Sequence, residues 1–505
     1  FRSRAGGGSD GGRLAPGRHR VDVFYGGAPR DGLAFGTGGR GEPTAFADNW
    51  PNRARWWFPS NDHPSDKARV RFEVLAPAGH TVVANGAKVE GPVPVSGDET
   101  AARWVWATRV PLPTYLMVVG MARFRRLELG EAACGRAPEA SGACVPVSVW
   151  ALAGDSAFAA ERFRRAPDMV DVYTRLFGPF PYAKLAHVES STRFGGMENA
   201  GAIFYARQPW ARGTMGEGVI AHETVHQWLG DAVTPARWRH LWLSEGFATY
   251  FAAVYFGRRD GPEAFRSRMD QARREALASD VAGRPVVDAT DDLYSLLNAN
   301  SYQKGAWVLH MLRGAVGDTA FFRGVRRYLR RHRHATAGTS DLRRAMEAAS
   351  GRDLRWFFRQ WVREPGHPRL EAEWSTEHSP DGDGETLVLE VRQTQPTGWP
   401  TFRLPLEVVA RTTGRGPGEG VTTRREATLT ERTETLRIAV PCPVAEVTLD
   451  PEGRLLATVD VRRRAREPAQ AARALSRTWL FRRATMAPMP RRRMGLTTSA
   501  SPISW

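Results

Sequence analysis

The chain has 505 residues, of which 42% are hydrophobic and 17 are Trp, a composition that excludes a disordered or fibrous protein and predicts two to four folded domains. Its formal net charge is +17, but residues 462 to 505 hold 11 Arg against the single acid Glu467, so the other residues carry only 17 − 10 = +7. Only four of the 71 basic residues are Lys, and no nucleic-acid-reading motif accompanies the charge. We therefore expect no nucleic-acid partner, and we attribute the Arg bias to genome base composition.

The apolar segments and the cysteines give evidence about the cellular location of the protein. No stretch reaches the ~20 apolar residues of a membrane-spanning helix, so we expect no transmembrane segment. The three cysteines lack metal-ligand spacing such as C-x-x-C. Cys134 and Cys144 either close a disulfide in an oxidising compartment, leaving Cys442 over, or stay free thiols, and both alternatives remain open. Because the sequence begins at Phe1, a signal peptide can be missing from it, and the location stays undecided between extracytoplasmic or secreted and cytoplasmic.

The predicted elements divide the chain into an α+β multidomain protein. Residues 1–16 are Gly-rich and predicted to be disordered, and residues 17–151 contain short alternating segments such as "ARVRFEVLAP" that predict an N-terminal β domain, with its first strands missing. Residues 152–366 have helical spacing, as in "GAWVLHMLRGAVG". The sequence "EPGHP" at 364–368 ends that pattern, and alternating strands predict a β-sandwich over 367–461. Residues 462–505 form a basic tail that we expect to be disordered.

A metal-binding pattern lies in the helical part. The stretch "AHETVHQWLGD" from 221 to 231 carries His222 and His226 four residues apart, so both imidazoles project from one helix face toward one metal ion. Glu223 can reach the open coordination position, where a water molecule would need a base. With 12 His in the chain this pentad alone is only moderately specific, and it needs a third ligand.

Glu245 is the candidate third ligand. It follows His226 in the apolar segment "LWLSEGFATYFAAVYF", where a buried carboxylate would be costly without a cation. The alternative without a metal is that Glu245 is an ordinary acidic residue in the first turn of a helix, where the helix dipole stabilises it. Two His and one carboxylate leave one position open, as catalytic zinc requires. The same three residue types also hold non-haem iron, but HExxH favours zinc.

These motifs and three others resemble the aminopeptidase N family of zinc metallopeptidases, which have HExxH, eighteen residues and then Glu. "FGGMENAG" at 194–201 is similar to the exopeptidase signature of that family, and "SYQKGAWVLHML" and "ARWWFPSNDHPSDK" match it in order. The resemblance covers roughly residues 18 to 460. It implies a thermolysin-like, mainly helical catalytic domain between an N-terminal β domain and a C-terminal β-sandwich.

The resemblance also implies a role for each site residue. His222, His226 and Glu245 would hold one Zn²⁺, Glu223 would be the catalytic base, and Tyr302 would stabilise the tetrahedral intermediate. Glu198 would bind the substrate ammonium, which makes the enzyme an exopeptidase that acts on peptides with a free N-terminus. The remaining substrate-binding positions come from the same signature: Gly195, Gly196, Met197 and Asn199.

Several assignments stay open at this point. A second contact to the substrate amine comes from Asp48 or Asn49. Asp231 is either a partner of a ligand His or an ordinary helix-end acid. Two other functions are alternatives to a zinc aminopeptidase: a catalytically silent zinc-bound scaffold for protein binding, and a hydrolase that acts on a lipid epoxide. Side-chain preference and oligomeric state are not predicted, and we expect structural roles for the remaining candidates His240, His310 and His367.

Overall fold

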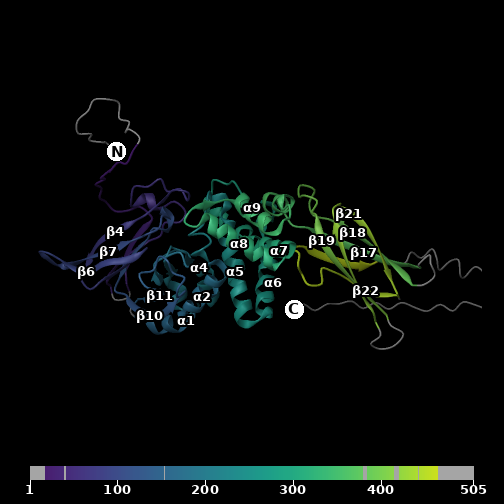
Figure 1. Ribbon diagram of the computed structural model, residues 1–505, viewed down its shortest axis with the longest axis horizontal. Helices are drawn as coiled ribbons and strands as arrows, with labels where there is room; N and C mark the ends of the chain where they lie inside the picture. Colours follow the sequence, from purple (N-terminus) through teal and green to yellow (C-terminus); the bar gives the residue numbers. More distant parts are fainter. Residues whose placement is uncertain are drawn as a thin grey trace, which may run out of the picture.

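The computed structural model describes residues 17–38, 41–152, 154–378, 384–413, 420–441 and 443–464. They form three parts in a row, a β part, a helical part and a second β part, as Figure 1 shows from purple through teal to yellow. The predicted disorder of residues 1–16 and of most of the tail, and the position of Cys442, lie outside the described residues. In the part of the chain that is described, no helix is long and apolar enough to cross a bilayer.

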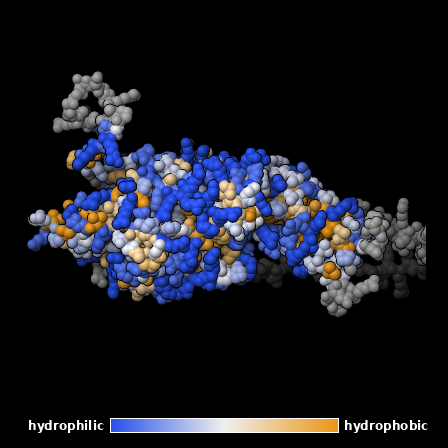
Figure 2. Space-filling model, in the orientation of Figure 1, coloured by the Kyte–Doolittle hydropathy of each residue, from blue (hydrophilic) through white to orange (hydrophobic). Residues whose placement is uncertain are grey.

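The first part is built from small antiparallel sheets. Buried aliphatic and Trp side chains, such as Val82, Trp104 and Trp106, form its core. Figure 2 shows hydrophobic residues at the end of the molecule formed by the β4–β7–β6 sheet, where Leu75 and Val89 are exposed. The sheets have the strand orders β1–β2–β9–β5, β4–β7–β6 and β3–β8, and their strands are β1 (Leu33–Thr37), β2 (Pro43–Ala47), β3 (Lys67–Ala68), β4 (Arg71–Pro77), β5 (Thr81–Ala84), β6 (Ala87–Val95), β7 (Asp98–Ala107), β8 (Leu112–Pro113) and β9 (Val119–Ala122).

The helical part begins with a five-stranded mixed sheet of order β10–β11–β12–β14–β13. Its strands are β10 (Arg125–Ala132), β11 (Val145–Ala151), β12 (Leu185–Ser190), β13 (Gly196–Met197) and β14 (Ala202–Ala206). Strand β11 pairs in parallel with β12, so β10 and β11, although they precede residue 152, belong to the sheet of the second part. The boundary expected at 151 therefore does not follow the sheet, since the sequence pattern marks strands but not their long-range partners.

Ten helices cover this sheet and continue beyond it among the described residues: α1 (Ser156–Phe163), α2 (Ala166–Phe177), α3 (Arg207–Ala211), α4 (Glu217–His226), α5 (Trp242–Asp260), α6 (Pro262–Leu277), α7 (Gly305–Val316), α8 (Asp318–His332), α9 (Thr339–Ser350) and α10 (Arg355–Phe358). Helix α5 is buried on nearly every side, as expected for a helix that is apolar all round. In Figure 1 it lies at the centre of the molecule, beside α4 and α6. The metal motif thus falls on two central, rigid elements.

Short turns and bridges complete the helical part. The strands β15 (Thr234–Pro235) and β16 (Thr336–Ala337) pair in parallel. The short helices of the described chain are η1 (Ala54–Trp56), η2 (Thr114–Leu116), η3 (Trp238–His240), η4 (Asp280–Gly283), η5 (Leu293–Leu296), η6 (Asn300–Lys304) and η7 (Arg359–Arg363), of which η6 and η7 are π-helical. A π-helical turn often marks a functional site, and η6 contains Tyr302.

The third part consists of two sheets, β21–β18–β17–β23 and β20–β19–β22. The strands are β17 (Arg369–His378), β18 (Glu385–Gln393), β19 (Leu404–Thr412), β20 (Thr422–Leu429), β21 (Thr433–Val440), β22 (Val444–Leu449) and β23 (Thr458–Arg463). They alternate buried and exposed positions, as a sandwich requires. Strand β23 ends at Arg463, two residues inside the expected tail, because it pairs with β17. The expected fold class, β domain, helical domain and β-sandwich, is confirmed.

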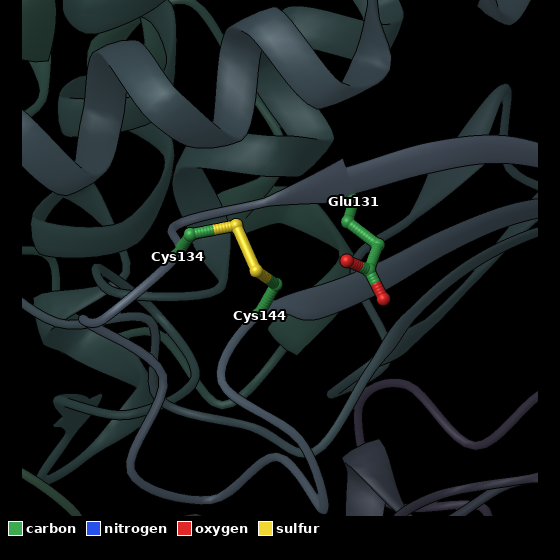
Figure 3. A group of neighbouring side chains, drawn as sticks. All are labelled: Glu131, Cys134 and Cys144. Atoms are coloured by element: carbon green, nitrogen blue, oxygen red, sulfur yellow. A yellow bond between two sulfur atoms is a disulfide. The ribbon is translucent and has the colours of Figure 1, made fainter.

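The loop between β10 and β11 is closed by a disulfide between Cys134 and Cys144 (Figure 3). The alternative of two free thiols is therefore wrong for this structure. Glu131 lies nearby in Figure 3, but sulfur atoms joined to each other are not available as thiolate ligands. We assign this group of three residues no metal.

Candidate metal centre and substrate cavity

Helix α4 presents His222 and His226 from successive turns of one face, and α5 presents Glu245 from its first turn. The two Nε2 atoms are 3.1 Å apart, and Glu245 Oε2 lies 3.2 Å from His222 Nε2 and 3.4 Å from His226 Nε2. The structure thus brings the three candidate ligand atoms together around one point.

These distances fit a tetrahedral metal ion. With zinc–ligand distances of about 2.0–2.2 Å, neighbouring ligand atoms of a tetrahedron lie about 3.3 Å apart. His226 Nδ1 lies 3.1 Å from Leu229 O, to which it can donate, and 3.0 Å from Ser244 Oγ. A proton held on Nδ1 leaves Nε2 with its lone pair directed at the metal position. The ligand atoms, their spacing and their orientation therefore suit zinc.

The charges of the centre favour a cation. Burial acts to raise the pKa of Glu245, but the neighbouring His226 and His222 outweigh it and lower this pKa to about 2. Burial lowers the pKa of His222, whereas Glu245 raises that of His226 well above its ordinary value. The lowered pKa of Glu245 keeps its carboxylate negative, so this carboxylate favours a positive charge beside it. A divalent cation between these side chains would meet the same demand.

Glu223 lies between the candidate metal ligands and the loop of residues 194–201, which we call the signature loop. It is buried, and burial raises its pKa well above the ordinary value. A Cβ atom added at Gly196 would collide with the Glu223 carboxylate, so only glycine allows β13 to approach this side chain so closely. Close packing against Glu223 therefore explains why the second glycine of "GGMEN", Gly196, is a glycine. Gly195, in contrast, has open space around it.

Glu198 shares one cavity with the candidate ligands His222, His226 and Glu245. Its side chain is buried, and burial together with nearby Glu245 raises its pKa. The cavity has a volume of about 560 Å³. The described residues that line it include no Lys and no Arg; they are Trp50, Phe194, Gly195, Gly196, Met197, Glu198, Gly218, Val219, His222, Glu223, His226, Glu245, Thr249, Gln271, Leu297, Tyr302 and Gln303.

Tyr302 enters the cavity from η6. Gly246 and Gly305 let α5 and the start of α7 approach closely, since a Cβ at Gly246 would lie 2.9 Å from the Gly305 Cα atom. This contact holds η6 against α5, and the Tyr302 ring stacks on His222 of α4 with centroids 6.0 Å apart. Burial raises the pKa of Tyr302 well above its ordinary value. The hydroxyl therefore keeps its proton and can donate it in a hydrogen bond.

Three residues that the sequence analysis named as candidates, Asn199, Asn49 and Asp48, do not line the cavity. Asn199 is buried, and its side-chain amide has no hydrogen-bond partner among the described residues. Asn49 donates to Thr114 O and Met117 O, and accepts from Trp57 Nε1. Its hydrogen-bonding capacity is used for structure.

Asp48 is also engaged away from the cavity. It pairs with Arg53 at 2.7 Å and with Arg193 at 3.4 Å, and Arg193 adjoins the signature loop. Asp48 thus ties the N-terminal part to the base of that loop. Neither Asp48 nor Asn49 lines the cavity; the neighbouring Trp50 does, and sequence reasoning missed it although it stands beside both candidates.

Gln227 holds the signature loop to helix α4, a role that the sequence analysis did not identify. Its Nε2 donates to Glu198 O and to Asp231 Oδ2, both at 3.0 Å, and its Oε1 accepts from Gly201 N at 2.7 Å. Asp231 therefore partners Gln227, while the candidate ligand His226 is held by Leu229 and Ser244. The only signal in the sequence was the position of Gln227 directly after the second ligand.

The other histidines lie apart from the metal centre. His240 contacts Thr339 Oγ1 at 3.0 Å, His310 packs against the Trp307 ring, and His367 packs against the Trp399 ring. None of the three lines the cavity of about 560 Å³. Burial lowers the pKa of each to about 4. These contacts fit the structural roles expected for them.

Known proteins are similar to this chain in sequence and in architecture. Two family models match in chain order: the Peptidase M1 N-terminal domain over residues 24–116 and the Peptidase family M1 domain over residues 164–361. An aminopeptidase N of Streptomyces lividans is 30% identical over 372 residues, 69% of this chain and 42% of that protein. A tricorn protease-interacting factor F2 of Thermoplasma acidophilum is 30% identical over 346 residues, 63% of this chain and 40% of that protein.

A solved structure agrees in fold. The crystal structure of Legionella pneumophila aminopeptidase A in complex with aspartic acid superposes with a TM-score of 0.68 at 18% identity, covering 83% of this chain and 48% of that one. The chain spans less than half the length of these relatives. With both models matched in order and the HExxH and Glu motif on the central helices, the chain belongs to peptidase family M1, the aminopeptidase N family of metallopeptidases.

Proposed function

We propose that this chain is a zinc-dependent aminopeptidase that removes the N-terminal residue of peptides and binds one Zn²⁺ through His222, His226 and Glu245. One observation carries the proposal: the buried carboxylate Glu198 shares a cavity with the three candidate ligands. Three buried carboxylates line this cavity, and the described lining offers no basic side chain except histidine. Such a site suits two positive groups, a metal ion and a substrate ammonium.

Each remaining residue has a chemical task in this proposal. When bound, zinc would polarise the scissile carbonyl and lower the pKa of water at the open position. Glu223 accepts the proton of the attacking water and passes it to the leaving amine. Tyr302 donates a hydrogen bond to the oxygen that becomes negative. Glu198 accepts hydrogen bonds from the ammonium and thereby fixes the first peptide bond at the reacting position.

The relatives support the same activity. They carry the names aminopeptidase N, aminopeptidase A and glutamyl aminopeptidase. Those proteins are more than twice as long as the matched region, so their activities are evidence for the proposal and not a property of this chain. Metal analysis after zinc reconstitution should give one equivalent per chain. A chain without zinc after reconstitution would contradict the ligand assignment.

The decisive experiment tests Glu198 against the substrate ammonium. Wild type and Glu198→Ala are compared on a peptide with a free N-terminus and on its acetylated form. Losing a desolvated charge pair costs ~2–5 kcal/mol, so acetylation should lower kcat/KM by roughly thirtyfold to several-thousandfold in the wild type. Glu198→Ala should show a similar loss on the free peptide and little further loss on the acetylated one, because both changes break the same pair.

Zinc content is the control in this experiment, and it should be equal in both proteins because Glu198 is not among the proposed ligands. Efficient cleavage of acetylated peptides, or losses that simply add, would refute the assignment of Glu198. Zinc binding without cleavage of any peptide would favour a silent scaffold.

A further inference from the structure

The exposed side of helix α8 consists almost entirely of arginine. Every residue of α8 that is exposed after Thr319 is an arginine, and the spacing of three and four residues places these arginines on one face of the helix. We call it the arginine face, and it consists of Arg323, Arg326, Arg327, Arg330 and Arg331. The apolar residues Phe321, Val325 and Leu329 of the same helix are buried on the opposite side.

No carboxylate neutralises the arginine face. Within the part of the chain that the structure describes, none of its five guanidinium groups forms an ion pair, and the one acid of α8, Asp318, pairs with Arg313 of α7 at 2.6 Å. Arg323 donates to Ala349 O, and Arg326 donates to Leu176 O at 3.5 Å. A carbonyl carries no net charge, so five Arg and no acid leave the face with a formal charge of +5.

The adjacent helix α9 shows how arginines are otherwise accommodated on this surface. Its Arg343 pairs with Glu347 at 2.7 Å, and its Arg344 pairs with Asp341 at 2.6 Å. Such pairs at spacings of three and four residues stabilise a helix, whereas arginines at the same spacings repel one another. A general abundance of arginine explains the residue type in α8, but it does not explain why acids are absent from the whole face.

The shape of the arginine face favours a ligand surface over an enclosed ligand. From residue 323 to residue 331 the helix rises by about 12 Å. None of the five arginines lines the cavity of about 560 Å³ at the candidate metal centre or the cavity of about 1340 Å³ beside α7. A guanidinium forms two parallel hydrogen bonds to one phosphate, so a row of them suits a plane that presents many phosphate groups.

Other occupants fit the arginine face less well. A single-stranded nucleic acid needs exposed aromatic rings for stacking, but Phe321 and Tyr328 of α8 are buried and Phe322 is half-buried. A protein partner needs apolar or aromatic anchors at the centre of its interface, and insertion into a hydrocarbon core needs apolar side chains as well. Contact at this face is therefore electrostatic and stays at the level of the charged groups.

We propose that the arginine face binds the phosphate headgroups of an anionic lipid bilayer and attaches the protein peripherally to such a membrane. This binding is independent of the proposed peptidase function, because none of the five arginines belongs to the candidate site. Salt opposes it, since the electrostatic screening length shortens from about 10 Å at 0.1 M to about 4 Å at 0.5 M.

The test is cosedimentation of the full chain with lipid vesicles. At about 0.1 M salt the chain should bind vesicles of phosphatidylcholine and phosphatidylglycerol, but not vesicles of phosphatidylcholine alone. Replacing Arg327, Arg330 and Arg331 together by Gln should weaken binding to the anionic vesicles by roughly a hundredfold, since each basic residue near such a surface contributes about fivefold. Lys at the same three positions should keep most of the binding, because the charge is retained.

The matched control replaces Arg411, Arg424 and Arg437 of the β-sandwich by Gln. These three are exposed and paired with acids, and their loss lowers the net charge by the same amount. The control should bind anionic vesicles nearly as the wild type does, and residues 465–505 are the same in every protein compared. Equal losses in both triple variants, or no loss in the arginine-face variant, would overturn the proposal. A greater loss of binding to duplex DNA than to vesicles in the arginine-face variant would also overturn it, and would identify a nucleic acid as the occupant.

Discussion

Replacing Gln227, the residue directly after helix α4, by Met removes its three side-chain hydrogen bonds, of which those to Glu198 O and Gly201 N hold the loop that carries Glu198. The side chain keeps its approximate length but can no longer bind Glu198 O, Asp231 Oδ2 and Gly201 N, which lie 3.0, 3.0 and 2.7 Å from it. Gln227 is fully buried, so water cannot replace these bonds without a rearrangement. The loop then loses its fixed distance from the metal ligands on α4.

We expect the substitution to affect both local stability and catalysis. Each buried polar group left without a partner costs about 1–3 kcal/mol, so three groups cost about 3 kcal/mol or more of local stability. A displacement of the reacting groups by about 1 Å lowers turnover by about a hundredfold. We expect kcat/KM on free peptides to fall by roughly ten- to a hundredfold, with zinc content unchanged. The ratio of free to acetylated peptide cleavage should fall as well, because Glu198 no longer meets the ammonium.

The matched control is Gln360→Met. Gln360 is also buried, and it joins the helical part to the β-sandwich by donating to Arg403 O at 3.2 Å and accepting from Arg403 N at 2.7 Å. It lies outside the cavity lining, so this variant should lose stability but keep kcat/KM and the free-to-acetylated ratio. Wild-type activity and selectivity in Gln227→Met, or equal losses in both variants, would refute the positioning role.

Three further predictions concern the base, the disulfide and the pH dependence of stability. Glu223→Gln should keep zinc but lower kcat by about a hundredfold or more, and near-normal turnover would show that the base is another residue. Replacing Cys134 and Cys144 by Ser should lower the free energy of unfolding by about 2–3 kcal/mol, because the cross-link restricts the unfolded chain, and denaturant melts that coincide with the wild type would contradict this. Burial lowers the pKa of Lys304 to about 7 from 10.5, so the unfolded chain binds more protons between these values and the free energy of unfolding contributed by this group rises with pH. Lys304→Met should reduce that rise in urea unfolding measured at pH 7 to 10, and an identical pH profile would refute the assignment.

The candidate metal centre could be recognised in the sequence because its pattern is local. His222 and His226 share one helix face by the geometry of the helix alone, and Glu245 is a charged residue inside an apolar segment. Both facts are visible in the sequence without knowledge of the fold. The order of β, helical and β parts follows equally from local periodicity.

The substrate cavity could not be predicted to the same degree, since its walls meet only through long-range packing. Trp50 and Phe194 are 144 positions apart, yet their rings are in contact. The second amine contact, left open between Asp48 and Asn49, could not be decided from the sequence for the same reason: Arg193, which pairs with Asp48, and Met117, to which Asn49 donates, are distant in sequence. The strand pairing of β11 with β12, which moved the domain boundary, is a third instance.

The lysines lead to a different conclusion from the one that composition suggested. Four lysines among 71 basic residues were interpreted as genome bias, yet three of the four bind main-chain carbonyls between separate parts of the fold. Lys67 of β3 donates to Asp231 O and Ala232 O, Lys184 donates to Ala84 O and Gly201 O, and Lys304 donates to Gly366 O. A compact ammonium fits converging carbonyl oxygens, whereas the planar guanidinium of Arg is larger and has fixed donor directions. The geometry of these carbonyl sites therefore gives a physical reason for lysine, and not arginine, at Lys67, Lys184 and Lys304.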